Sequence, residues 1–150
     1  MRMAIDLALE NARTARGGPF GALVVREGKV IATGSNSVTS ANDPTAHAEI
    51  VAIRNACRAL HHFQLAGCDI YTSCEPCPMC MGSIYWARPD HVYYASTAAD
   101  AAAAGFDDKV IFEQLRLPPD GRSVPMVQLL REESLAAFRA WEQNPGKIPY

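Results

Sequence analysis

The sequence predicts one α/β domain built around a mixed β-sheet, and three observations lead to this fold class. Segments with the apolar spacing of helices alternate with short runs rich in β-branched and aromatic residues. A turn at residues 26–29 separates two such runs, which indicates an antiparallel hairpin and so a sheet that is not purely parallel. The 150 residues, 49% of them hydrophobic, suffice for one buried core.

The first part of the chain has the pattern of a helix followed by a hairpin. Residues 2–16 carry an apolar stripe at helical spacing, formed by Ile5, Ala8, Leu9 and Ala12. Gly17-Gly18-Pro19 ends this helix. Residues 20–25 and 30–35 are apolar runs suited to paired strands around the turn, and residues 35–41 are expected to form a polar loop.

A second helix is expected to begin at Asp43 and Pro44, because Asp is a favoured helix cap and Pro suits the first helical position. It runs to about residue 60. Its buried stripe comprises Ile50, Ile53, Ala56, Cys57 and Leu60. Residues 69–73, which follow Gly67, are expected to form a brief strand.

The third long helix is expected to begin at Pro78 and to continue to about Trp86, since Pro89 cannot extend it. Residues 91–95 are rich in β-branched and aromatic side chains and predict a strand. Residues 98–104 are mostly alanine and predict a helix.

The C-terminal third is expected to continue the same domain. Residues 118–121 form a Pro- and Gly-containing turn rather than a linker. Residues 127–130 are assigned to a strand and residues 132–141 to a last helix. No internal repeat interrupts the chain, so residues 1–150 are expected to form a single domain.

Composition narrows the class of protein. Fourteen basic and sixteen acidic side chains nearly balance, which argues against a large nucleic-acid footprint. No uncharged stretch is long enough to span a membrane, and Asp6 and Glu10 near the N-terminus argue against a signal peptide. Five cysteines, an odd number, suit a reducing cytoplasm in which thiols bind metal or pack in the core.

Two short motifs carry the chemistry. His47-Ala48-Glu49 is followed about thirty residues later by Pro76-Cys77-Pro78-Met79-Cys80, the spacing of zinc-dependent nucleobase deaminases. One neutral imidazole and two thiolates can hold zinc and leave its fourth position open for water. We therefore predict that His47, Cys77 and Cys80 bind Zn²⁺, and that the ion acidifies a water for attack on a substrate.

Glu49 is the predicted proton carrier. A carboxylate beside the metal-bound water can accept its proton and deliver it to the substrate. His47 and Glu49 are two residues apart, so they point to nearly opposite sides of an ideal helix. Both can reach one metal only if the site lies over the end of the helix, and the predicted start at Asp43 supports that placement.

Cys74 is interpreted differently from Cys77 and Cys80. The three cysteines share a three-residue spacing, which is part of an iron–sulfur pattern, but no fourth cysteine follows. Cys74 ends a predicted strand and is expected to support the site or pack in the core. His61 and His62 end the second helix, where a structural role is favoured.

With these residues in view, the chain resembles the bacterial guanine deaminases of the cytidine-deaminase-like superfamily. The resemblance runs nearly end to end and is carried by five segments. They are Gly18-Pro19-Phe20-Gly21-Ala22, Asn42 to Glu49, Tyr71 to Cys80, Ile84 to Pro89 and Ala104 to Asp108. The zinc motif identifies only the superfamily, whereas Trp86 and the Gly105-Phe106-Asp107-Asp108 segment narrow it to guanine.

The resemblance implies a three-layer α/β/α fold and hydrolysis of guanine to xanthine and ammonia. It implies a homodimer whose C-terminal segments are exchanged between subunits. By position, His47, Cys77 and Cys80 bind zinc, and Glu49 shuttles protons. The remaining implied roles are hydrogen bonding to the base by Asn36, flanking of the purine by Phe20 and Trp86, proton transfer assisted by Asp108, and closure of the pocket by Tyr150.

Physical chemistry agrees with several of these roles. A flat purine suits aromatic walls, and a buried base edge suits an amide such as that of Asn36, which can both donate and accept. The pattern does not choose between Asp107 and Asp108; only the positional match selects Asp108.

Three alternatives stay open at this stage. A cytosine deaminase shares the zinc motif. A tRNA adenosine deaminase also shares it but should be basic near its pocket, whereas acidic residues slightly outnumber basic ones in residues 101–150. An inactive zinc-binding module is the non-enzyme alternative, and Glu49 argues against it because structural zinc sites need no such base.

Overall fold

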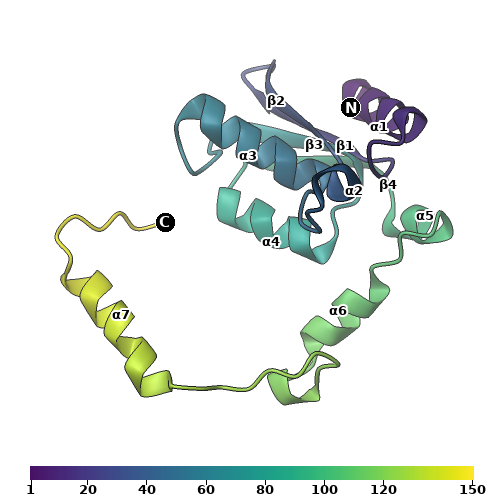
Figure 1. The fold of residues 1–150 in the computed structure, drawn as a ribbon. Coiled ribbons are helices and arrows are strands. Elements are labelled where there is room, and N and C mark those ends of the chain that lie inside the picture. Colours follow the sequence, from purple (N-terminus) through teal and green to yellow (C-terminus); the bar gives the residue numbers. More distant parts are fainter. The chain divides into compact units, whose positions relative to one another are not determined.

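In the computed structural model, which describes residues 1–150, a four-stranded mixed sheet forms the framework of the first part of the chain (Figure 1). Strands β1 (Gly21–Arg26) and β2 (Lys29–Ser35) form the predicted antiparallel hairpin. Strand β3 (Cys68–Cys74) pairs antiparallel with β1, and β4 (His91–Ser96) pairs parallel with β3. The strand order β2-β1-β3-β4 confirms a mixed sheet.

Helices cover both faces of this sheet. Gly21 faces α1 (Arg2–Thr14), because a Cβ atom there would lie 2.5 Å from the Ala4 carbonyl oxygen. The next residue along β1, Ala22, points to the opposite face and packs in the core with α3 (Ala48–Leu60) and α4 (Pro78–Ala87). The predicted three-layer α/β/α arrangement is confirmed (Figure 1).

The core lies between the sheet and the α3–α4 layer. Its fully buried side chains come from β1, β3, α3 and the loop before β3, and they comprise Ala22, Val24, Ala48, Ala52, Ala56, Leu65, Cys68 and Ile70; α4 adds the buried Ile84 and Ala87. Small residues allow α3 to approach the sheet closely. A Cβ atom at Gly34 on β2 would lie 2.2 Å from the Ala48 carbonyl oxygen, so glycine is required for this contact at the N-terminus of α3.

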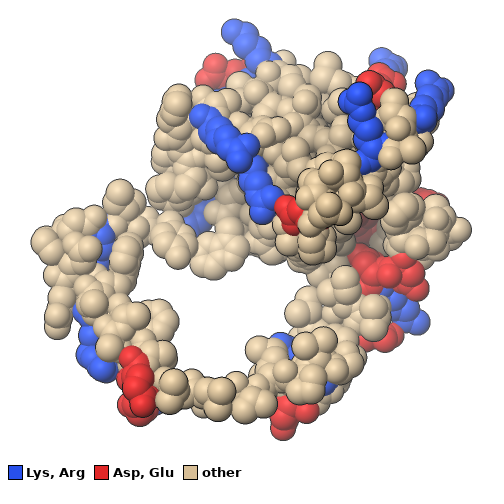
Figure 2. Space-filling view, viewed as in Figure 1, with Lys and Arg blue, Asp and Glu red and all other residues tan.

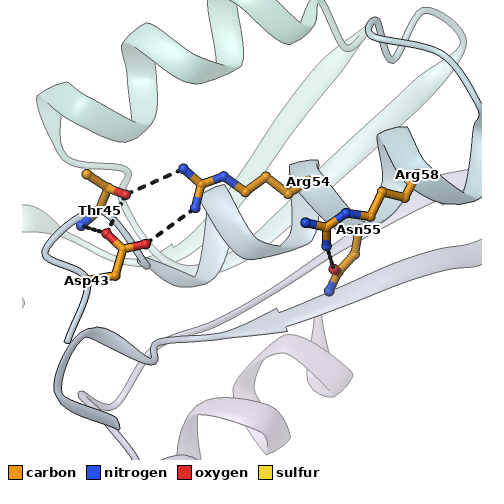
Figure 3. Close-up of polar contacts among 5 residues, drawn as sticks. All are labelled: Asp43, Thr45, Arg54, Asn55 and Arg58. Atoms are coloured by element: carbon orange, nitrogen blue, oxygen red, sulfur yellow. Dashed lines mark hydrogen bonds and ion pairs between the residues drawn. The ribbon is translucent and has the colours of Figure 1, made fainter. Parts of the chain in front are cut away.

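The predicted helix start at Asp43 and Pro44 is wrong. Asp43 accepts hydrogen bonds from the backbone N–H and the hydroxyl of Thr45, and it pairs with Arg54 at 3.6 Å (Figure 3). This local turn satisfies the carboxylate before the helix begins. The predicted loop at residues 35–41 also contains a short helix, α2 (Val38–Ala41), and α3 begins only at Ala48.

The chain divides into two compact units, Met1–Lys109 and Val110–Tyr150. Helix α5 (Ala98–Ala103) belongs to the first unit and begins with a capping box between Thr97 and Asp100. Helix α6 (Lys109–Arg116), which the sequence pattern did not predict, leads into the second unit.

The second unit contains the expected last helix, α7 (Arg131–Gln143), and a short 3₁₀ turn at Pro119–Gly121. The predicted strand at residues 127–130 is wrong. These residues pair with no strand, and Leu130 adopts a left-handed conformation with φ of 51° as the cap of α7. No residue of Val110–Tyr150 is buried. None of the chain's helices combines the length and the apolar character needed to cross a membrane.

Candidate metal centre and substrate site

His47 lies at the N-terminal end of α3 rather than within the helix. Its backbone is extended, with φ of −69° and ψ of 156°, and it is the cap that precedes Ala48. Because His47 is outside the helix, the opposite-sides problem posed by its separation from Glu49 does not arise. The convergence over a helix end that the sequence required is present, although the helix starts later than predicted.

The two predicted thiolate ligands lie at the start of α4. Cys77 is the cap of this helix, Pro78 occupies the first turn, and Cys80 is fully buried one turn into the helix. Proline suits this position because its missing N–H would have no partner there, and the positive end of the helix dipole favours thiolate at Cys77.

The three ligand atoms converge. They lie within 4.8 Å of one another. The Nδ1 atom of His47 is 3.5 Å from Sγ of Cys77 and 3.5 Å from Sγ of Cys80. A tetrahedral zinc ion bonded to sulfur at about 2.3 Å and to nitrogen at about 2.0–2.1 Å separates such atoms by roughly 3.5 Å. The residues therefore fit zinc, which His47 would bind through Nδ1.

The electrostatics of the pair also suit a cation. A hydrogen bond from the Cys80 thiol lowers the pKa of Cys77 to about 4, although burial opposes this shift. The same hydrogen bond and burial raise the pKa of Cys80. A hydrogen bond with Cys77 raises the pKa of His47. Without the metal, shared protons hold the sulfur and nitrogen atoms of these residues close together. A zinc ion replaces those protons when it binds.

Glu49 is buried beside these ligands, with 5% of its surface exposed. Its Oε2 atom is 3.5 Å from Sγ of Cys80, and its Oε1 atom accepts a hydrogen bond from the Thr72 hydroxyl at 3.2 Å. Burial raises the pKa of this carboxyl group. A carboxyl group with a raised pKa next to a metal site can both accept and donate a proton near neutral pH.

Sequence reasoning missed Thr72. It lies on β3 between Ile70 and Cys74, on the face of the sheet that packs against α3, and it is 1% exposed. A polar residue at a core-facing position of a strand was the available signal, because a buried hydroxyl needs a partner. Its bond holds the Glu49 carboxylate in one orientation.

The structure separates Asp107 from Asp108. Asp107 accepts a hydrogen bond from the backbone N–H of Lys109 at 2.9 Å and so serves the start of α6. The pKa of Asp108 is raised, first by burial and then by the negative charge of Cys77. Asp108 is therefore the acid that is electrostatically coupled to the metal ligands.

Phe20 and Asn36 lie on neighbouring segments. The backbone N–H of Asn36 donates to the Phe20 carbonyl at 3.1 Å, and the next residue, Ser37, donates its N–H to the carbonyl of Ala46, which precedes His47. The Phe20 ring packs edge-on against Phe106, with ring centroids 5.0 Å apart. The hairpin, the α3 end and the segment before Asp108 thus meet here.

The Asn36 side chain can offer less than the sequence suggested. Its Oδ1 atom already accepts from the N–H groups of Gly18 and Val38, at 3.1 and 3.3 Å. The expectation that this amide would both donate and accept is corrected, because both lone pairs of the oxygen are used. Only its Nδ2 group is available to a ligand.

Trp86 and Tyr150 are not brought to the ligands in the same way. Trp86 is in the last turn of α4, 64% exposed, and about 9 Å of helical rise beyond Cys80. Tyr150 belongs to the second unit and is 71% exposed. Cys74 lies outside the ligand group and its thiol donates to the Thr97 carbonyl at 3.5 Å, as a supporting residue would.

Comparison with known proteins places this geometry in a family. Residues 1–96 match the family model described as the cytidine and deoxycytidylate deaminase zinc-binding region. The chain is 50% identical to a guanine deaminase of Bacillus subtilis over 150 residues, which cover 100% of this chain and 96% of that protein. It is 45% identical over 95 residues to a tRNA-specific adenosine deaminase of Agrobacterium fabrum, covering 61% of this chain and 62% of that one.

Solved structures give the same picture. The X-ray structure of guanine deaminase from Bacillus subtilis superposes with a TM-score of 0.97, covering 99% of this chain and 95% of that chain at 50% identity. A guanine deaminase structure from Nitrosomonas europaea superposes with a TM-score of 0.66, covering 92% of this chain and 80% of that chain at 30% identity.

Proposed function

The chain belongs to the cytidine and deoxycytidylate deaminase zinc-binding family, and we propose that within this family it is a guanine deaminase, which hydrolyses guanine to xanthine and ammonia. One observation carries this proposal. The similarity to guanine deaminase extends over the whole chain, including Val110–Tyr150, whereas the tRNA-specific relative aligns with only 61% of it.

The residues of the metal centre bind and orient the reactants. His47, Cys77 and Cys80 hold the zinc ion, whose geometry they fit. When bound, zinc supplies a water that is acidic enough to attack the ring at neutral pH. The Thr72 hydroxyl holds Oε1 of Glu49, and Oε2 of the same carboxylate lies 3.5 Å from Sγ of Cys80, beside the metal ligands.

Glu49 carries two protons in succession. It first accepts a proton from the attacking water and delivers it to ring nitrogen N3, while the oxygen bonds to C2 of guanine. It then moves the remaining hydroxyl proton to the exocyclic amine, the C2–N bond breaks, and ammonia leaves. Burial raises the pKa of this carboxyl group, which favours its protonated form and so supports the role of proton carrier.

Asp108 is proposed to assist departure of the amine from the other side. Its pKa is raised by burial and by the charge of Cys77, which favours the protonated form that such a role needs. Asp107 is not proposed for this role, since its carboxylate is used at the start of α6.

The base is proposed to bind against Phe20 and to receive a hydrogen bond from Asn36. A backbone hydrogen bond joins Asn36 to Phe20, and the next residue, Ser37, bonds to the carbonyl of Ala46 just before His47. Trp86 is proposed as the second aromatic wall and Tyr150 as the residue that closes the pocket. Their support comes from the match to the family pattern, whereas Phe20 and Asn36 also have support from their position.

We also infer a homodimer in which the Val110–Tyr150 segment of each chain packs on its partner, so that residues 1–150 act as one functional domain. The segment leaves large apolar side chains exposed, among them Val110, Phe112, Leu115, Phe138 and Trp141. Burying such side chains is worth about 1.5–3 kcal/mol each. A segment with no core of its own needs another surface to cover.

The first unit offers such a surface. A cavity of about 330 Å³ lies between α1, the end of β4 and α5, lined mostly by apolar side chains such as Ile5, Leu9 and Phe106. Strand β4 is the outer strand of the sheet, and Tyr93 and Tyr94 on it are 42% and 51% exposed. An exposed strand with aromatic side chains is typical of an interaction surface.

Mixed dimers test the exchange. One chain carries Glu49→Gln and the other lacks Tyr150, so neither homodimer has a complete site. If the C-terminus closes the partner's pocket, the mixed dimer contains one site with both Glu49 and Tyr150, and co-expression restores turnover. If each C-terminus closes its own pocket, no mixed dimer is active, and the exchange is excluded.

A side-by-side assay tests the activity. Guanine, cytosine, adenine and a tRNA anticodon stem-loop are supplied to the zinc-loaded enzyme, and ammonia release is measured. We expect turnover of guanine only. Turnover of the stem-loop would favour the activity of the tRNA-specific relative. We do not expect it, because basic and acidic side chains are interspersed, without a broad basic area, on the face shown in Figure 2. A zinc-loaded protein that releases no ammonia from any substrate would be a binding module.

A reducing compartment, the cytoplasm, is proposed for this enzyme. All five cysteines are free thiols, and two of them are zinc ligands that oxidation would destroy.

A further inference from the structure

A buried asparagine on α1 lies outside the machinery described so far. Asn11 is 5% exposed, although it is on a helix whose other polar residues face solvent. Its Nδ2 atom donates to two backbone carbonyl oxygens, of Gly18 at 2.7 Å and of Asn36 at 2.8 Å. Because both partners are acceptors, the atom that faces them must be the amide nitrogen.

The second carbonyl belongs to the residue proposed to bind the base. The Asn36 side chain is fixed in turn, because its Oδ1 atom faces the N–H groups of Gly18 and Val38. Two N–H donors require an oxygen opposite them, so the amide cannot flip. The Nδ2 group of Asn36 makes no hydrogen bond within the protein. Every buried side-chain nitrogen or oxygen in the structure has a hydrogen-bond partner. The Nδ2 group has none, so it is not buried and is accessible to a ligand.

Gly18 joins both asparagines into one hydrogen-bond network. Its carbonyl accepts from Asn11, its N–H donates to Asn36, and its carbonyl also accepts from the N–H of Phe20 at 2.8 Å. Gly17 allows the close approach, since a Cβ atom there would lie 2.0 Å from the Asn36 carbonyl oxygen. This network therefore fixes the backbone positions of Phe20 and Asn36, the two residues proposed to contact the base.

We propose that Asn11 is a positioning residue of the substrate site, which holds Asn36 so that it presents only N–H donors to an acceptor atom of the purine. The inference rests on the proposed binding of a purine base by Asn36. It adds a selection rule: the ring edge that meets Asn36 must carry an acceptor, and a base with a donor at that edge is rejected. Asn11 itself does not touch the substrate.

The first experiment tests the donor rule with Asn36→Asp. The carboxylate still accepts from Gly18 and Val38, so the hydrogen-bond network is kept, but the new side chain has no donor for the base. We expect zinc content and melting temperature to be unchanged or higher, while KM for guanine rises on the order of 10- to 100-fold. An unchanged KM in Asn36→Asp would overturn the donor rule.

The second experiment is a double-mutant cycle of Asn11→Ala and Asn36→Ala. If Asn11 acts through Asn36, the single Asn11 variant raises KM about tenfold, whereas in the Asn36→Ala background it changes KM by less than about twofold. Equal effects in both backgrounds would mean that Asn11 only stabilises the fold. Should Asn11→Ala fail to fold, Asn11→Ser replaces it in the cycle, because its short hydroxyl keeps a donor but cannot reach both carbonyls.

The matched control is Asn55→Ala. Asn55 on α3 also donates its Nδ2 to a backbone carbonyl, that of Thr33 on β2, at 3.0 Å, but it lies in the exposed Arg58 contact shown in Figure 3. We expect this variant to leave KM unchanged. A KM increase equal to that of Asn11→Ala would show a general effect of loosening the packing against β2.

A readout without substrate separates this inference from the proposed function. Hydrogen exchange at the amides of Gly18 and Val38 reports the bonds to Asn36 Oδ1, and Asn11→Ala should accelerate both by about tenfold or more. If the wild type does not deaminate guanine, the proposed function fails, but faster exchange in Asn11→Ala still supports the hydrogen-bond network. If exchange is unchanged, the positioning role fails whatever the substrate.

Discussion

Both units of this chain contain many apolar side chains, but only the first unit buries them. Met1–Lys109 buries its apolar side chains between a sheet and two helices and brings the candidate zinc ligands together at the N-terminal ends of α3 and α4. Val110–Tyr150 has two amphipathic helices but no buried residue. The first unit supplies the metal chemistry, and the second can contribute to stability and function only by covering another surface. Mutations should therefore act differently in the two units.

Loss of a metal ligand in the first unit should have the largest effect. Cys80→Ala removes a buried thiolate ligand, and we expect zinc content to fall well below one ion per chain with no measurable turnover. Elemental analysis measures the metal. Cys57→Ala is the control, because Cys57 lies outside the ligand group, and normal zinc in Cys80→Ala would contradict ligation.

Glu49→Gln should separate metal binding from chemistry within the same unit. The amide keeps the size of the side chain but cannot carry protons, so kcat should fall about 10²- to 10⁴-fold while zinc content stays normal. Glu10→Gln on the exposed face of α1 is the control. Wild-type kcat in Glu49→Gln would remove Glu49 from the mechanism.

A mutation in the second unit should change assembly and leave the metal in place. Phe138 on α7 is 65% exposed in the single chain, yet Phe138→Ser should weaken the dimer about 10- to 100-fold if α7 packs on a partner. Analytical ultracentrifugation measures the dissociation constant. Val30→Ser, at an exposed apolar residue of β2, is the control, and an effect equal in both variants would break the comparison between the units.

Gly34→Ala tests the packing that places the metal ligands. The new methyl group would collide with the backbone of α3 at Ala48, next to His47. We expect a loss of about 1–3 kcal/mol of unfolding free energy and weaker zinc binding. Denaturant unfolding gives the free energy, and Gly82→Ala on α4, where a Cβ atom meets nothing within 4 Å, is the control.

The smallest effect is expected on the surface of the first unit. Arg54→Ala removes the exposed ion pair with Asp43 (Figure 3), which should lower the free energy of unfolding only slightly and leave turnover unchanged. The same unfolding assay measures it. A large loss would mean that the turn before His47 depends on this pair.

The elements that sequence analysis predicted well are those with strong local signals. The four strands follow from runs of apolar, β-branched and aromatic residues, and α4 follows from the prolines that flank it. Helices α1 and α7 were also predicted, although of the α1 stripe only Ala8 is buried. The two wrong assignments have one cause. Asp43 has the side chain of a helix cap but uses it in a turn with Thr45, and residues 127–130 have the composition of a strand without a strand to pair with. Local composition does not reveal which partner is present.

The sequence by itself determined the chemistry of this protein, because the identity and spacing of His47, Glu49, Cys77 and Cys80 select a zinc centre with a proton carrier. Only the tertiary structure decided the orientation of those groups. Thr72 on β3 turns Glu49, and Asn11 on α1 fixes Asn36. These partners are 23 and 25 residues apart in sequence, and a hydrogen bond across that distance depends on how the strands and helices pack, which no local pattern encodes.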